Sequence, residues 1–375
     1  MSVFTVYFCG TGSHRFDDRN PNFWNGELIA TLAANTGGRE FVDWIVVDGP
    51  GSGNLQDDAL FVDDGDHSKV TGTLFGTGWK ENVQHAVQVI KGKSTWSRTQ
   101  LSEEQYQNLK SAGVPIPDAS ATGSWFWRTY DYGERAVTPQ ALQEQLIKQM
   151  RKPLIPSVVN LVGWSRGGIS CHMLANAMAA DPELAGVAVN IFAIDPVPGV
   201  GNIQEEKVQL GPNIKEYVGF YARDERSKGF ACVIPMTAFN TPVHLFPMPG
   251  RHATLVGNAS ADGAGSGKVL AEPGRIVRYF AEVCLTRWGT VLDKRESLDD
   301  ATLEQCHAAM LDADDQYQAM RKHSYTAITE GSVEARSVHH GLKQTDFDKV
   351  AGESMQPKEG LGLAPLTSAA YQSLR

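Results

Sequence analysis

The stretch that decides the fold is VVNLVGWSRGG, residues 158–168. Its first five residues form an apolar run typical of a buried strand, and an alanine-rich helical pattern follows over residues 168–180. Gly163 and Gly167 stand two residues before and two residues after Ser165. In a strand–turn–helix context, this Gly-x-Ser-x-Gly spacing makes a tight turn that lifts the serine hydroxyl above the carboxyl edge of a sheet. The sequence therefore predicts that Ser165 is a catalytic nucleophile.

The rest of the first 290 residues alternates short β-branched runs with helical patterns. Strands are predicted over residues 3–8, 44–47, 158–162, 187–194, 217–222 and 243–246, and helices over 26–35, 80–90, 139–150, 168–180 and 275–288. Alternation of this kind indicates a mostly parallel sheet with helices on both faces. With the serine turn, it predicts an α/β fold of the α/β-hydrolase type.

The predicted core spans residues 1–290 and is interrupted by an insertion at about 92–137, which includes the aromatic run Trp125-Phe126-Trp127. Either these rings form a lid or substrate wall, or they fill a small core of the insertion itself. Residues 291–375 are more polar, with a helix expected over 301–322. We expect them to form a helical C-terminal segment packed on the core.

The net charge of −9 and the pI of about 5.6 exclude a general attraction to nucleic acid or to anionic lipid. Transient contact with a membrane surface would therefore depend on apolar side chains or on a local basic patch. The chain contains no run of 18 apolar residues and no secretory signal, so we expect no transmembrane segment and a cytoplasmic location as synthesised. Export by a machine that needs no cleaved signal stays open. The five cysteines are scattered with no C-x-x-C pair, which gives no sign of a metal site.

A serine nucleophile needs a general base, and the base needs an orienting acid. In α/β-hydrolases the histidine follows the serine and the acid along the chain. Seven histidines lie downstream: His172, His244, His252, His307, His323, His339 and His340. We select His252 because it lies in a loop just after the last predicted core strand, where the base is expected.

Two aspartates compete for the role of the acid. Asp195 and Asp224 each end a predicted strand after the nucleophile unit, where sites gather in open α/β sheets. Asp224 has charged neighbours, and a structural ion pair would explain it. Asp195 stands in an apolar run and needs a partner, which an imidazole would supply. The sequence favours Asp195 and keeps Asp224 as the alternative.

The oxyanion of an acyl-transfer intermediate needs hydrogen-bond donors. One is expected from the backbone N–H of Arg166, at the start of the helix after Ser165. The second is expected from Gly10 or Thr11, in the loop after the first strand, because glycine lets the backbone approach a substrate closely.

Several segments together resemble the α/β-hydrolase domain of the first class of bacterial type VI secretion lipase effectors, which also occurs in many uncharacterised bacterial and fungal proteins. The elbow at 163–168 resembles the family's Gly-Phe-Ser-Arg-Gly-Ala, and residues 194–197 stand where the family has Asp-Thr-Val. Residues 224–226 match an Asp-Glu-Arg motif, and residues 245–252 resemble Trp-Phe-Pro-Gly-x-His. Cys9 replaces the usual aspartate of the first-strand Asp-Gly-Thr turn, and the Asp-Val-Gly-Gly after the histidine is missing.

The resemblance covers about residues 3–257 and implies Asp195 as the triad acid, phospholipase or carboxylesterase activity, and no cofactor or metal. It also implies a lipid or other ester substrate and, for a secreted toxin, an immunity protein as partner. Two alternatives stay open: a non-catalytic binding protein on the same fold, and a peptidase or thioesterase with the same triad.

Overall fold

The computed structural model describes residues 2–50, 52, 79–93, 120–122, 129–131, 139–199, 201–258, 269–322, 335–358, 361 and 367–375. The aromatic run at 125–127 lies outside these residues, so the two interpretations of the insertion remain predictions. Within the insertion, β3 (Ser120–Thr122) and β4 (Thr129–Asp131) pair as a separate antiparallel sheet.

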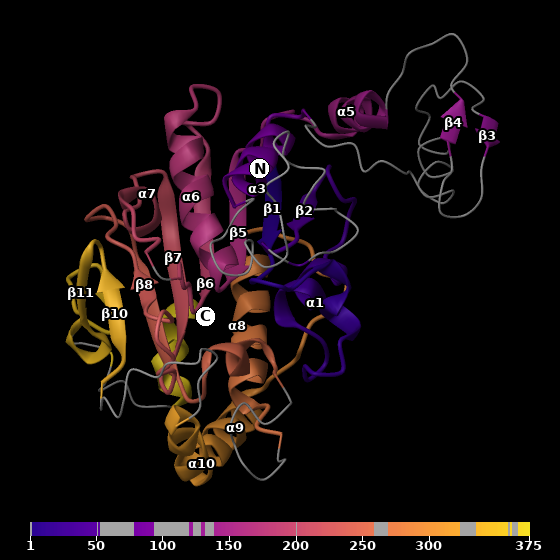
Figure 1. The fold of residues 1–375 in the computed structure, drawn as a ribbon. Helices are drawn as coiled ribbons and strands as arrows, with labels where there is room; N and C mark the ends of the chain where they lie inside the picture. Colours follow the sequence, from indigo (N-terminus) through magenta and orange to yellow (C-terminus); the bar gives the residue numbers. More distant parts are fainter. Residues whose placement is uncertain are drawn as a thin grey trace.

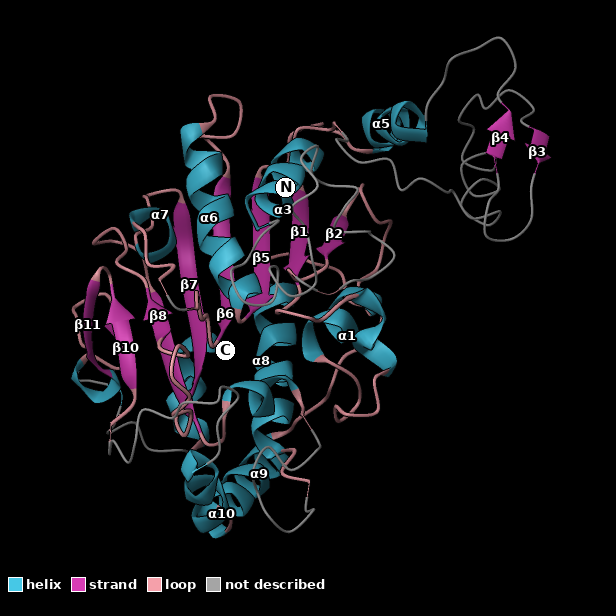
Figure 2. Ribbon diagram, viewed as in Figure 1, coloured by secondary structure: helices cyan, strands magenta, loops and turns pink. Residues whose placement is uncertain are grey.

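The centre of the molecule is a parallel sheet of seven strands in the order β12-β9-β7-β6-β5-β1-β2 (Figure 1). In chain order these strands are β1 (Val3–Phe8), β2 (Trp44–Val47), β5 (Val158–Trp164), β6 (Ala188–Ile194), β7 (Ile214–Ala222), β9 (Val243–Met248) and β12 (Met355–Gln356). Figure 2 shows β7, β6, β5, β1 and β2 side by side with helices around them. The α/β fold predicted from the alternating pattern is confirmed.

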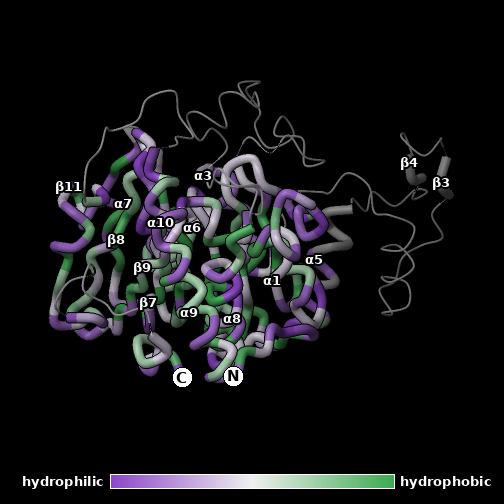
Figure 3. The backbone as a smooth tube through the Cα atoms, turned by 90° about the horizontal axis from the view of Figure 1, so that it is seen from below, coloured by the Kyte–Doolittle hydropathy of each residue, from purple (hydrophilic) through white to green (hydrophobic). Residues whose placement is uncertain are grey.

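In chain order the α-helices of the described residues are α1 (Leu28–Ala34), α3 (Trp79–Ile90), α5 (Pro139–Met150), α6 (Arg166–Ala180), α7 (Glu205–Val208), α8 (Glu272–Arg287), α9 (Asp300–Asp312) and α10 (Asp314–Ala319). Of these, α3 and α6 pack on one face of the sheet, and α1 and α8 pack on the other. Alternate residues of a strand enter two cores: Val159 and Leu161 join α3 and α6, whereas Val162 and Trp164 join α1 and α8. Burial on both faces explains why most side chains of the central strands are apolar. In Figure 3 hydrophobic stretches of the backbone are green and hydrophilic stretches are purple.

Four buried polar side chains on the α1 and α8 side of the sheet are hydrogen-bonded to one another. Asn160 in β5 donates to the Thr290 hydroxyl at 3.0 Å and accepts from Asn190 at 2.9 Å. The Thr290 hydroxyl also lies 2.8 Å from that of Thr5. These bonds satisfy buried groups and attach the segment after α8 to the amino-terminal half of the sheet.

In place of the single helix expected over residues 301–322, the C-terminal segment contains α9 and α10, with a break at Ala313 between them. It also contains strands that the sequence did not indicate. Residues 337–340 form β10 (Ser337–His340) and residues 343–346 form β11 (Lys343–Asp346), in a second sheet with β8 (Cys232–Ile234). Such short strands have little periodicity of their own and depend on pairing with β8.

The chain end returns to the main sheet. Tyr371 is 1% exposed, and its ring centroid lies 4.3 Å from that of Phe280 and 5.0 Å from that of Phe246. Because β12 also extends the sheet beside β9, the C-terminal segment packs against the core in two places. Within the part of the chain described here, no helix is long and apolar enough to span a bilayer.

Glu27, the N-cap of α1, generates a test of stability. Its side chain is fully buried and accepts from the Ala30 N–H at 2.9 Å, and burial raises its pKa to about 7. A raised carboxyl pKa favours the folded state below its unfolded value and loses that contribution as pH rises through 7. We expect the free energy of unfolding to fall by about 2 kcal/mol from pH 5 to pH 8 through this group.

Chemical denaturation of wild type and Glu27→Gln at both pH values measures this contribution, because the amide cannot titrate and still offers an oxygen to Ala30. The wild type should lose more stability than the variant. If the free energy of unfolding changed by the same amount between pH 5 and pH 8 in both proteins, Glu27 would not titrate in this range.

Candidate active site

The turn at Ser165 has the shape that its glycine spacing predicts. Ser165 has φ 59° and ψ −126°, a conformation that is costly for a residue with a side chain. A Cβ on Gly163 would lie 2.3 Å from the Gly167 carbonyl oxygen, and a Cβ on Gly167 would lie 2.2 Å from the Phe8 carbonyl oxygen. The turn therefore requires glycine on both sides of the serine.

Ser165 lies at the carboxyl edge of the sheet and at the N-terminus of α6. Its N–H donates to the Ile194 carbonyl at 3.0 Å, and its own carbonyl accepts from the Val197 N–H at 3.2 Å. These bonds fix the serine beside the residues that follow β6. The amino end of α6 adds a positive partial charge at this position.

Asp195 follows β6 and meets His252 directly. The His252 Nδ1 lies 2.6 Å from Asp195 Oδ2, and the aspartate side chain is fully buried. Asp195 also has a positive φ of 41°, a conformation that aspartate tolerates better than most residues. Two of the residues selected from sequence are thus in contact, across the carboxyl ends of β6 and β9.

His252 opens a short 3-10 helix (His252–Val256) and lies between two aromatic rings. Its ring centroid is 5.1 Å from that of Trp164 and 5.1 Å from that of Phe230. Since Trp164 immediately precedes Ser165, this packing places the imidazole beside the serine turn. Burial of the ring, at 4% exposure, limits competition from water.

The three residues predicted to serve an oxyanion also lie together. The Arg166 Nη1 donates to the Thr11 hydroxyl at 3.1 Å, so the start of α6 contacts the loop after β1. In that loop, a Cβ on Gly10 would lie 2.3 Å from the Trp164 ring, so glycine leaves room for the indole. Burial lowers the pKa of the Arg166 guanidinium.

Asp224, the other acid, has different partners. Its Oδ2 accepts from the Gly250 N–H at 2.9 Å, and its Oδ1 accepts from Arg321 Nε at 2.8 Å. These bonds connect the loop that leads into His252 with the end of the C-terminal helices. The structural ion pair expected for Asp224 is present, and the oxygen that meets His252 Nδ1 belongs to Asp195.

Arg336 was not selected from the sequence, although it contacts the site. Its Nη1 lies 2.5 Å from Asp195 Oδ1, and its Nη2 lies 3.0 Å from Asp195 Oδ2. A carboxylate in the apolar run at 194–197 calls for a cation. The sequence could not show which of its 34 lysines and arginines pairs with Asp195, because Arg336 lies 141 residues after it in the chain.

The charge state of Asp195 follows from these contacts. Burial by itself would raise the pKa of this carboxyl group, but the Arg336 charge and the hydrogen bond from His252 together lower it to about 2. Asp195 is therefore an anion over the whole neutral range. Among the described residues, no group of three or more histidine, cysteine, aspartate or glutamate side chains could hold a metal ion.

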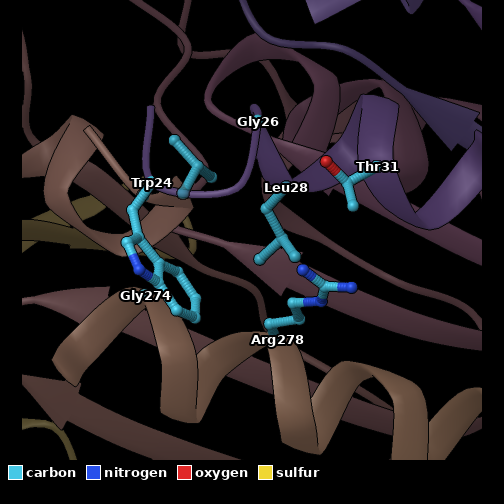
Figure 4. A pocket seen from close by; sticks show the side chains of 8 residues that line it. Trp24, Gly26, Leu28, Thr31, Gly274 and Arg278 are labelled. Atoms are coloured by element: carbon cyan, nitrogen blue, oxygen red, sulfur yellow. The ribbon is translucent and has the colours of Figure 1, made fainter. Parts of the chain in front are cut away.

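Two hollows lie between α8 and its neighbours. The smaller, about 10 Å³, is lined by Trp24, Leu28, Thr31 and Arg278 with glycine backbone, and it has room for no more than one water molecule (Figure 4). The larger, about 320 Å³, lies between α8 and α9 and shares Trp24. Neither includes a residue of the serine turn.

No protein-family model matches the chain, and no curated protein matches its sequence. The distantly similar solved structures include the following two. An uncharacterized protein from Pseudomonas aeruginosa is 14% identical, with a TM-score of 0.45 over 77% of this chain and 46% of that one. The Tle1 effector bound to the VgrG spike of the Type 6 secretion system is 13% identical, with a TM-score of 0.34 over 68% of this chain and 50% of that one.

The chain thus spans about half the length of both structures. Likeness at this level carries no argument about activity, so the functional case depends on the residues of the site.

The contact at Gly167 generates a second test. We expect Gly167→Ala to destabilise the protein by about 2 kcal/mol or more, because the new methyl group overlaps the backbone at the end of β1. Gly186→Ala is the matched control, since a Cβ there meets nothing within 4 Å. Thermal or urea unfolding of both variants measures the difference, and equal stability would mean that the turn is not packed as described.

Proposed function

We propose that the protein is a serine hydrolase that cleaves carboxylic esters, with Ser165 as the nucleophile, His252 as the general base and Asp195 as the orienting acid. The observation that carries the proposal is the 2.6 Å contact between His252 Nδ1 and Asp195 Oδ2 at the sheet edge where the strained turn presents Ser165. The order Ser165, Asp195, His252 is also that of α/β-hydrolases.

The chemistry follows from the tautomer that Asp195 selects. An Nδ1–H donated to the carboxylate leaves the lone pair of the imidazole on Nε2, the nitrogen that takes the serine proton in a triad. The Ser165 oxygen would then attack the ester carbonyl carbon, and the protonated imidazole would return its proton to the leaving alcohol. Water would hydrolyse the acyl-enzyme by the same steps.

The proposed oxyanion donors are the backbone N–H of Arg166 and one from Gly10 or Thr11. The first lies at the N-terminus of α6, where the helix dipole favours negative charge. The Arg166–Thr11 hydrogen bond holds the β1 loop close to that helix end. Such donors supply about 3 kcal/mol each in acyl-transfer enzymes.

The substrate class is proposed from the motif resemblance to lipase effectors: a phospholipid or another lipid ester. A role as an exported toxin, with an immunity protein as partner, has the same basis. A panel of phospholipids, short acyl esters and thioesters would identify the class, and peptide hydrolysis without ester hydrolysis would overturn it. Harmless expression in the periplasm would count against the toxin.

Replacing the nucleophile tests the reaction itself. We expect Ser165→Ala to lower ester hydrolysis at least a thousandfold, with the fold retained, because the nucleophilic oxygen is removed. Ser157→Ala is a matched control, since Ser157 is exposed just before β5, at the opposite end of that strand. Turnover at the wild-type rate by Ser165→Ala would show that Ser165 is not the nucleophile. Failure of a fluorophosphonate to label Ser165 in the folded protein would favour a binding protein instead.

Replacing each acid separately tests which aspartate orients the base. We expect Asp195→Asn to lower kcat by about a hundredfold to ten-thousandfold, because the amide no longer fixes the imidazole. Asp224→Asn should mainly lower thermal stability, because it weakens the bonds to Gly250 and Arg321. A greater loss of kcat in Asp224→Asn, measured on the same ester, would reverse the assignment.

A further inference from the structure

Arg336 brings the C-terminal segment into the proposed triad. Its side chain is 4% exposed overall and donates to both oxygens of Asp195. The same guanidinium donates to the backbone carbonyls of Ala222 and Phe230. Four acceptors on three separate segments therefore fix one planar group beneath the carboxylate.

Asp195 has no solvent exposure, so all of its stabilisation comes from these neighbours. Oδ1 accepts from Arg336 and from the Ala222 N–H at 3.0 Å, and Oδ2 accepts from Arg336 and faces His252. Taking a carboxylate out of water is costly, and a bidentate guanidinium is the strongest compensation that a side chain offers. A neutral imidazole alone would leave the negative charge uncompensated.

The second sheet explains how this arginine reaches the site. Arg336 directly precedes β10, which runs parallel to β8, with Val338 opposite Cys232. The loop before β8 carries Phe230, whose ring packs on His252 and whose carbonyl accepts from Arg336 at 3.0 Å. The pairing of β10 with β8 thus positions both Phe230, which packs on His252, and Arg336, which binds Asp195.

We propose that Arg336 is a positioning residue for the triad: it fixes the Asp195 carboxylate in the orientation that receives the His252 Nδ1–H and keeps that carboxylate charged. This inference depends on the proposed function. It makes the C-terminal segment part of the active-site architecture, because the chain up to His252 supplies the proposed nucleophile, acid and base but not this cation.

The pH dependence of Ser165 reactivity distinguishes the two possible roles of Arg336. If Arg336 only stabilised the fold, its replacement would not change this dependence. The groups that face Asp195 are Arg336 before β10, His252 after β9, Tyr221 and the Ala222 N–H in β7, and Cys232 in β8. Arg336 is the cation among them that lowers the pKa of Asp195 most. Its removal lets the carboxyl group take up a proton at higher pH, so the acid limb of reactivity should move upward.

The experiment measures the rate constant for labelling of Ser165 by a fluorophosphonate as a function of pH, in the full chain. For Arg336→Met we expect a loss of tenfold or more near neutral pH and an acid limb displaced upward by about one unit or more. Arg336→Lys should recover part of the rate, since lysine restores the positive charge but not the bidentate hydrogen bonding of a guanidinium. Added guanidinium ion should raise the rate of Arg336→Ala but not of wild type.

Arg321→Met is the matched control, because Arg321 is also a C-terminal arginine on a buried aspartate, Asp224. Its labelling profile should keep the acid limb of wild type. Folding of each variant is checked by circular dichroism, and Arg336→Lys carries the test if Arg336→Met does not fold.

A folded Arg336→Met that labels with the wild-type rate and profile would overturn the inference, as would Arg336→Lys with the full wild-type rate. Both outcomes leave the proposed function standing. Failure of wild type to label at all would instead remove the proposed function, so the two failures are distinguishable.

Discussion

The structure of the site depends on one buried anion. Asp195 stands at the end of β6 with no access to water, and its two oxygens are occupied by an imidazole, a guanidinium and a backbone N–H. Each partner comes from a different part of the chain, so satisfying this charge draws together β7, the loop after β9 and the segment before β10. The cost of an unpaired carboxylate is what makes their arrangement specific.

The second constraint is steric and acts on the serine. The turn after β5 is so tight that it needs two glycines. A side chain on Gly163 would overlap the turn's own backbone, and a side chain on Gly167 would overlap the backbone at the end of β1. The packing of β1 against β5 then brings the first loop, with Gly10 and Thr11, to the start of α6. Geometry of this kind is set by the backbone, and surface substitutions would change it little.

Local pattern carried the prediction of the fold a long way. The apolar run before Ser165, the glycine spacing and the alternation of elements indicated the parallel sheet, because burial on both faces leaves a signal in each strand. The pairing of His252 with Asp195 was accessible for a similar reason: both residues follow core strands whose carboxyl ends meet at one edge. The charged neighbours of Asp224 suggested a structural ion pair, but the Arg321 that binds it lies 97 residues away, so the sequence could not name this partner.

The features that the sequence did not reveal depend on contacts between residues far apart in the chain, and the most important of these contacts is polar. Residues 337–346 form strands only because β8 offers an edge, and their own composition is mixed. Arg336 lies in a polar stretch without a motif that distinguishes it from other arginines. Its role can be inferred only once Asp195 is known to be buried. Contacts of this kind depend on the charge balance of the folded interior, which no local window contains.

The position of Arg336 in the chain has a consequence for the order in which the partners of Asp195 become available. During synthesis Ser165, Asp195 and His252 all leave the ribosome before Arg336 does. A nascent chain that has folded through β9 still holds Asp195 without its cation, and the strand that delivers the cation must dock on β8 first. The buried carboxylate therefore gains its cation only after the segment that contains Arg336 has been made and has paired with β8.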